Sequence, residues 1–433
     1  MARASIEKIT VIGGGSTYTP ELIEGFIQHE NDLRVGEIVL FDIDPQRLEI
    51  VGGMAQRMVQ RGEIETQVRL SLDRPSALEG AHFVLSSIRV GQMEARIRDE
   101  KIPLKYGVVG QETTGPGGTL KAWRTIPVTL DIAREVERLA PHGWYINFTN
   151  PSGIITEALL NHTSLKAVGL CNHPINMQAT LAQALGVGTR DVFLEWVGLN
   201  HVNWVRRLYA RGKDVTADLL GRLEEFAGHD ELGLFDPELI RMLGVIPSSY
   251  LQYYYYHPRK LAELQAARQT RGEAVREVER ALLAKYADPN QVTKPPELAL
   301  RGGARYSEAA VQLILSLTLD RRDTQIVDTR NGGSLPDLPP DASVEAPCVV
   351  GAHGVTPLRM GPLPETVRAL CQQVKAWESA TVKAGISGSR RDARLAMMLN
   401  PLVPSYEVAA ALVDEMLEAN RDHLPQFFKN DQD

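Results

Sequence analysis

Short apolar runs alternate with amphipathic stretches over the first 170 residues of the chain. The runs are rich in β-branched side chains and predict six strands, at 7–12, 37–44, 68–72, 82–88, 144–148 and 166–170. Apolar residues at helical spacing predict helices from about Thr19 and at 45–61, 119–139 and 154–161, with a Gly-rich loop from 89 to about Gly118. Strands alternating with helices form right-handed βαβ units around a parallel sheet. The pattern therefore predicts an α/β fold with a doubly wound, Rossmann-like domain over residues 1–171.

Helical periodicity dominates the second half of the chain. It predicts helices at 174–186, 216–227, 258–286, 306–319, 364–384, 388–399 and 405–420. Strand-like pieces occur at 192–210, 324–329 and 346–350, and the Pro-rich stretch 334–347 predicts a surface loop. This pattern is typical of a separate α+β domain over residues 172–433.

Length and composition support two domains and exclude several classes of partner. A chain of 433 residues exceeds one ordinary core, and its formal net charge of -7 disfavours nucleic acid and anionic membrane surfaces as partners. There is no apolar run of the ~20 residues that span a bilayer, and the N-terminus enters a strand pattern without a secretory segment. We therefore expect a cytoplasmic protein. The three cysteines, Cys171, Cys348 and Cys371, are too few for a disulfide framework.

The segment GGGSTYTP directly follows the first predicted strand and opens a helix. Small residues at such a turn let backbone N–H groups approach a pyrophosphate at the helix N-terminus; here they are Gly13, Gly14, Gly15, Ser16 and Thr17. Asp42 ends the next strand, where an acid binds ribose hydroxyls and repels a 2′-phosphate, which favours NAD over NADP. Tyr18 stands at the third glycine position of the fingerprint, so a glycine-rich turn without a ligand is the alternative.

Other candidate groups follow later strands of the same predicted sheet. Cys171 comes at the end of the sixth strand, in VGLCNHPIN; ligands of open α/β sheets bind at such ends, although a buried cysteine usually only packs. From the residues alone, Cys171 can be core, ligand or nucleophile. Arg89 and Arg96 follow the fourth strand, and their planar guanidinium groups suit a phosphate.

Six motifs occur in one order between about residues 7 and 420: VIGGGSTYTPELI, IPLKYGVVGQETTGPGG, NFTNPSG, GLCNHPIN, GLNH and YLQYYYY. Together they resemble glycoside hydrolase family 4, and within it the 6-phospho-β-glucosidases. The resemblance implies an NAD-dependent glycosidase, an exception to the usual two-carboxylate chemistry, which also needs a divalent metal, usually Mn²⁺. It further implies a C-terminal domain like that of lactate and malate dehydrogenases, and a homodimer or homotetramer.

The resemblance also assigns roles to residues of this sequence. Cys171 and His201 match the metal ligands of the family, and a thiolate with a neutral imidazole suits a divalent metal that keeps positions open for substrate. Tyr250 matches the catalytic base, and Arg271 a cation near the metal. The remaining matches concern substrate and cofactor: Arg96 contacts the phosphate, Asn150 lies near both sugar and nicotinamide, and Asn172 contacts substrate. Glu112 can pair with Arg96 or touch the sugar, while His173, where an aliphatic residue is usual, can be a third ligand, a substrate contact or a neighbour.

The implied reaction acts on a phosphorylated β-glucoside. It proceeds through oxidation of sugar C3 by NAD⁺, deprotonation of C2, elimination of the aglycone, addition of water and reduction of C3. Family members with α-glucosidase or α-galactosidase specificity are one alternative. A conventional NAD-dependent dehydrogenase, or a nucleotide-sensing protein without catalysis, would share the N-terminal half.

Overall fold

A nine-stranded sheet forms the centre of the molecule in the computed structural model, which describes residues 4–226, 231–302 and 305–429. Six strands are parallel, in the spatial order β3-β2-β1-β4-β5-β6: β1 (Ala4–Ile12), β2 (Leu33–Phe41), β3 (Gln67–Ser71), β4 (Phe83–Ser86), β5 (Trp144–Asn147) and β6 (Lys166–Gly169). The order reverses between β1 and β4, as in a doubly wound dinucleotide-binding fold. The predicted parallel sheet is confirmed.

Three later strands continue this sheet beyond β6. They are antiparallel: β11 (Asp323–Arg330), β12 (Ser343–Gly351) and β13 (Gly354–Pro357). The chain thus returns to the first sheet after building other elements. The division at residue 171 stays a prediction, because the second half of the chain completes the sheet of the first.

Helices cover both faces of the sheet, since successive strand side chains point to opposite faces. Ile9 and Val11 join one hydrophobic cluster, which is covered by α1 (Thr19–Gln28), α2 (Pro45–Arg61), α12 (Arg271–Tyr286) and α13 (Tyr306–Leu319). Ile12 points into the other cluster, covered by α3 (Arg74–Leu78), α5 (Gly115–Leu139) and α6 (Ser152–His162). Cys348 and Cys371 are fully buried in these two clusters.

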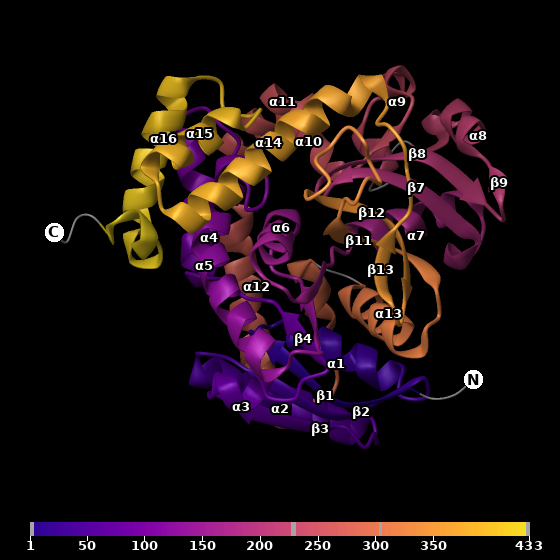
Figure 1. The fold of residues 1–433 in the computed structure, drawn as a ribbon, viewed down its shortest axis with the longest axis vertical. Helices are drawn as coiled ribbons and strands as arrows, with labels where there is room; N and C mark the ends of the chain where they lie inside the picture. Colours follow the sequence, from indigo (N-terminus) through magenta and orange to yellow (C-terminus); the bar gives the residue numbers. More distant parts are fainter. Residues whose placement is uncertain (1–3, 227–230, 303–304, 430–433) are drawn as a thin grey trace.

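A smaller antiparallel sheet packs beside the first one. Its strands are β7 (Val192–Leu199), β8 (Val202–Ala210), β9 (Lys213–Asp214) and β10 (Ile246–Pro247). The helices around it are α7 (His173–Leu185), α8 (Thr216–Gly221), α9 (Pro237–Leu243), α10 (Gln252–Tyr255) and α11 (His257–Ala266). The last helices, α14 (Glu365–Ser387), α15 (Arg390–Leu399) and α16 (Tyr406–Ala419), gather at the end of the molecule away from β1–β3 (Figure 1). Among the described helices, none is both long and apolar enough to cross a membrane.

Three local predictions were wrong. The loop expected at 89–118 contains the helix α4 (Gln92–Lys105), which has no clear apolar stripe because charged residues such as Arg96 and Glu100 are buried. The helix expected at 258–286 is two helices, because Thr270 starts α12 with a capping box. The last five residues of the expected loop 334–347 belong to β12, which pairs with β11.

A buried ion pair joins α4 to α5. Arg124 donates to both carboxylate oxygens of Asp99 at 2.8 and 2.6 Å, and the two side chains are 1% and 0% exposed. Replacing Asp99 with alanine leaves the Arg124 charge buried, so we expect the free energy of unfolding to fall by about 3–5 kcal/mol. Urea denaturation measures this change. Lys101→Ala, which removes an exposed pair with Glu273, should change it by less than about 1 kcal/mol, and equal losses in the two variants would contradict the prediction.

Candidate active site

A single cavity of about 900 Å³ lies at the carboxyl ends of the parallel strands. Its lining runs from Asp42 and Ile43, after β2, to Cys171 and Asn172, after β6. Five neighbouring strands, β2-β1-β4-β5-β6, separate these ends. At roughly 4.8 Å per strand the cavity extends about 19 Å. It thus offers the length that an extended ligand such as a dinucleotide needs, at the position where doubly wound folds bind one.

The glycine turn after β1 is held tightly at one side of this cavity. Gly13 has φ +87°, and a Cβ there would lie 2.3 Å from the Ser87 carbonyl oxygen, so only glycine fits. The Gly15 N–H donates to one oxygen of Asp42 at 2.8 Å, while the other accepts from Asp44 N–H at 3.1 Å. Asp42 therefore shapes the turn as well as lining the cavity.

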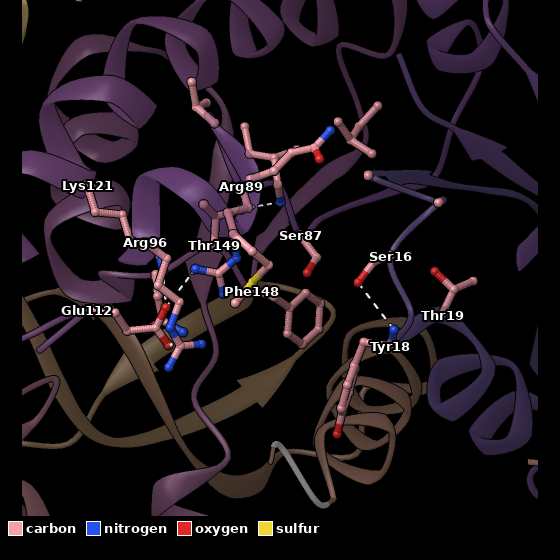
Figure 2. A pocket seen from close by; sticks show the side chains of 18 of the residues that line it. Ser16, Tyr18, Thr19, Ser87, Arg89, Arg96, Glu112, Lys121, Phe148 and Thr149 are labelled. Atoms are coloured by element: carbon pink, nitrogen blue, oxygen red, sulfur yellow. Dashed lines mark hydrogen bonds and ion pairs between the residues drawn. The ribbon is translucent and has the colours of Figure 1, made fainter. Parts of the chain in front are cut away.

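The predicted residues of the turn divide into two groups. Gly13, Gly15 and Ser16 line the cavity, and Ser16 and Tyr18 lie on its glycine-turn side in Figure 2. Gly14 and Thr17 do not line it: Gly14 packs on Leu40, and Thr17 is fully buried. Gly14 and Thr17 can therefore contribute to ligand binding only through their backbone groups or by shaping the turn.

Positive charge is concentrated around the cavity. Seven cations line it, namely Arg47, Arg74, Arg89, Arg96, Lys121, Arg271 and Arg301, against four acids, namely Asp42, Glu94, Glu112 and Glu279. This local excess stands in a chain whose net charge is -7. The arrangement favours anionic ligands.

Three of these cations converge on Glu112 (Figure 2). Its carboxylate oxygens lie 2.7 Å from Arg89, 3.3 Å from Arg96 and 3.1 Å from Lys121. Burial alone would raise the pKa of Glu112, but Arg96, Lys121 and Arg89 together hold it well below its usual range. Glu112 thus pairs with Arg96, one of the two roles left open by the sequence, and since it also lines the cavity its contact with a sugar stays a prediction. Burial and Arg89 lower the pKa of Lys121 to about 7.

Cys171 and His201 meet at the other end of the cavity. Cys171 Sγ lies 3.7 Å from His201 Nε2, and both side chains are buried. One divalent cation at roughly 2.1–2.3 Å from each atom would span this distance. Burial lowers the pKa of His201 to about 3, which leaves the imidazole neutral as a ligand must be, and burial raises the pKa of the Cys171 thiol. Within the described residues no third His, Cys, Asp or Glu completes a metal cluster, so a cation held here keeps open positions.

Tyr250 stacks directly on His201. The ring centroids are 3.7 Å apart and the ring planes differ by 12°. Burial, and then the nearby Cys171 and Glu112, raise the pKa of Tyr250 well above its usual value, while Arg96 acts in the opposite direction. Arg271 lines the cavity, but its Nη2 donates to the Leu300 carbonyl at 2.8 Å. Arg96 is thus a cation that favours ionisation of this phenol, and the place of Arg271 near the metal stays a prediction.

Asn150 and Asn172 also line the cavity, whereas His173 does not. The buried Oδ1 of Asn150 has no hydrogen-bond partner in the described part of the chain, which leaves it available to a ligand. His173 Nε2 lies 2.9 Å from Ser249 Oγ and 3.2 Å from Glu231 Oε2. Its side chain therefore supports the segment before Tyr250.

Sequence reasoning missed several groups that line the cavity. Lys121 lies on α5, and Arg301 pairs with Glu279 at 3.1 Å beside the glycine turn. Tyr306 packs edge-on against Tyr18, with ring centroids 5.8 Å apart. Arg301 and Glu279 belong to no recognisable motif. The only signal for Lys121 was its position nine residues after Glu112, at the start of the next predicted helix.

Known proteins resemble the chain over nearly its whole length. A family model described as family 4 glycosyl hydrolase matches residues 8–187, and one described as the C-terminal domain of that family matches residues 196–403. A probable 6-phospho-β-glucosidase of Bacillus subtilis (strain 168) is 45% identical, covering 97% of this chain and 98% of that protein.

Solved structures agree with these matches. The 6-phospho-β-glucosidase of Thermotoga maritima, solved with manganese, NAD⁺ and glucose-6-phosphate, is 35% identical with a TM-score of 0.90, over 96% of this chain and 99% of that one. A malate dehydrogenase from Plasmodium falciparum, 12% identical, has a TM-score of 0.54 over 88% of this chain and 99% of that one. At that identity the second likeness concerns the fold alone, which it confirms as dehydrogenase-like.

Proposed function

We propose, from the premise that the chain belongs to family 4 of the glycosyl hydrolases, that it hydrolyses 6-phospho-β-glucosides with NAD and a divalent metal as cofactors. The observation that carries this function is one cavity that combines a glycine turn, a Cys–His pair and an excess of cations. A phosphorylated sugar, a dinucleotide and a metal each find matching groups there. Self-association as a dimer or tetramer and a cytoplasmic location are part of the same proposal; the first rests on the family resemblance and the second on the sequence pattern.

The glycine-turn side of the cavity suits NAD. In this proposal the turn at Gly13, Gly14, Gly15, Ser16 and Thr17 takes the pyrophosphate, and Asp42 takes the ribose hydroxyls. The unpartnered Oδ1 of Asn150 stands after β5, toward the Cys–His end, where the nicotinamide and sugar would meet.

The Cys–His end suits a divalent metal, which in this proposal is Mn²⁺ held by Cys171 and His201. When bound, NAD⁺ and the metal supply reversible oxidation at sugar C3 and stabilisation of negative charge on the neighbouring oxygens. The oxidised sugar has an acidic proton on C2. Tyr250, fixed by its stacking on His201, is the group proposed to remove that proton as general base. Burial holds its phenol protonated, so in this proposal a cation held by Cys171 and His201, together with Arg96, favours the ionised form.

The cations around Glu112 suit the 6-phosphate of the substrate. Arg89 and Arg96 present planar donors, and Lys121 adds a third positive charge. Asn172 and Arg271 line the same cavity and are proposed to orient the sugar. Deprotonation of C2 is followed by loss of the aglycone. Addition of water to the sugar and reduction of C3 then complete the hydrolysis.

An aryl 6-phospho-β-glucoside tests the function directly. With NAD and Mn²⁺ present, we expect nitrophenol release without a net rise in absorbance at 340 nm, because the cofactor is regenerated in each turnover. Stoichiometric NADH without nitrophenol would identify a conventional dehydrogenase. Cleavage of the α-anomer alone would identify another specificity, and NAD binding without either reaction would identify a nucleotide sensor.

The pKa of Lys121 predicts how phosphate binding depends on pH. Because that pKa is lowered to about 7, Lys121 is charged below pH 7 and loses its proton as the pH rises through that value. The inhibition constant of glucose 6-phosphate should therefore rise by roughly 10-fold between pH 6.5 and 8.5, the loss of one charge-assisted hydrogen bond. Lys121→Arg keeps its charge, so its inhibition constant should change much less over this range. An equal rise in the variant would assign the pH dependence to another group.

A further inference from the structure

A carboxylate of the large sheet holds the turn that carries His201. Glu345 lies on β12 and is 1% exposed. One of its oxygens accepts from Asn200 Nδ2 at 2.9 Å, and the other from Trp196 Nε1 at 2.8 Å and Asn203 Nδ2 at 2.6 Å. All three donors belong to the β7–β8 hairpin, so this one side chain ties the two sheets together.

The turn between β7 and β8 has an unfavourable backbone. His201 has φ +67°, in the left-handed region that costs a residue with a side chain about 1–3 kcal/mol. Such a conformation persists only when its surroundings hold it. The two asparagines bound to Glu345 stand directly before His201 and two residues after it, and Asn203 also donates to the Leu199 carbonyl at 2.9 Å.

A carboxyl group at this buried position calls for an explanation beyond packing. No lysine or arginine pairs with Glu345 in the ion pairs of the described residues, and burial, followed by the nearby Asp328, raises the pKa of Glu345 well above its usual value. Three N–H donors compensate part of the penalty of burial. The Asn200 side chain connects this carboxyl group to the Cys171–His201 pair, because it hydrogen-bonds Cys171 as well as Glu345.

We infer that Glu345 is a positioning residue of the metal centre, which fixes His201 in reach of Cys171 through Asn200 and Asn203. It touches neither substrate nor cofactor and acts through the hairpin turn. This inference rests on the proposed function only in assigning the metal to Cys171 and His201. Residues that do not bind the metal themselves but orient one of its protein ligands typically contribute 10–100-fold to metal affinity.

The test measures Mn²⁺ binding to the full-length protein, by electron paramagnetic resonance of free Mn²⁺, in the absence of substrate. Glu345→Gln keeps the shape but turns an N–H toward Asn200, so we expect Mn²⁺ affinity to fall by roughly 10–100-fold while NAD affinity is unchanged. Glu378→Gln, which alters a buried acid of α14 paired with Lys375, is the matched control and should bind Mn²⁺ normally.

Several outcomes would overturn the inference. Wild-type Mn²⁺ affinity in a folded Glu345→Gln variant would do so, as would an equal loss in Glu378→Gln. Should Glu345→Gln fail to fold, Asn203→Ala removes one donor of the turn, and wild-type Mn²⁺ affinity there would count against the inference. Mn²⁺ binding by a wild-type protein that cleaves no phosphoglucoside would refute the proposed function and leave this inference standing.

Discussion

Replacing Cys171 with serine is expected to lower kcat/KM for an aryl 6-phospho-β-glucoside by roughly 10³-fold or more. The hydroxyl has nearly the size of the thiol, but it does not ionise in a buried site as a metal-bound sulfur does. His201 would then hold the cation almost alone, because in the described part of the chain the Cys171–His201 pair, 3.7 Å apart, is joined by no further His, Cys, Asp or Glu in a metal cluster. Loss of several kcal/mol of Lewis-acid stabilisation corresponds to at least three powers of ten in rate.

The loss in Cys171→Ser should be specific to the metal. Its NAD affinity, measured by titration without Mn²⁺, should stay within about two-fold of the wild type, because the glycine turn lies at the other end of the cavity. Cys348→Ser is the matched control, since Cys348 is fully buried in a hydrophobic cluster outside the cavity lining. Full Mn²⁺-dependent turnover by Cys171→Ser would remove the thiolate from the proposed site.

Tyr250→Phe is expected to lower kcat by about 10²- to 10⁴-fold, the usual contribution of a general base. The substitution removes the phenol oxygen and keeps the ring that stacks on His201 at 3.7 Å. Mn²⁺ and NAD affinities should therefore be retained. Hydrolysis in D₂O provides a second measurement: the wild type should place deuterium at sugar C2, and the variant should not.

Tyr253→Phe is the control for aromatic packing near Tyr250. Tyr253 is close to Tyr250 in the chain but is absent from the cavity lining, so we expect its kcat to stay within a few-fold of the wild type. Undiminished deuterium incorporation by Tyr250→Phe would show that another group removes the C2 proton. Equal losses in both variants would point to packing.

The parallel half of the fold could be predicted because its signal is local. Six short strands with intervening helices leave few arrangements, and the observed strand order is one of them. Strand periodicity does not say which sheet a strand joins, so β11, β12 and β13 could not be placed beside β6 in advance. The helix α4 was not predicted because its buried face carries charged residues. Asp99 and Arg96 are buried in ion pairs there, whereas helical periodicity is recognised from apolar side chains on the buried face.

The candidate site was predictable where its residues end strands. Gly13, Asp42, Asn150 and Cys171 follow four different parallel strands, and the ends of parallel strands meet at one edge. Groups from helices and distant turns were not predictable, since only the fold brings Arg301 to the glycine turn. The same holds for Glu345, whose relation to His201 depends on how two sheets pack.

The excess of cations around the cavity has a consequence for the order of assembly. A divalent ion binds more weakly in a cavity lined by seven cations and four acids before an anion arrives, and the pyrophosphate or sugar phosphate is such an anion. Each ligand then lowers the dissociation constant of the other, and by thermodynamic linkage the two effects are equal. The enzyme would thereby hold its metal most tightly when substrate is present, and the synergy should weaken as salt screens the charges.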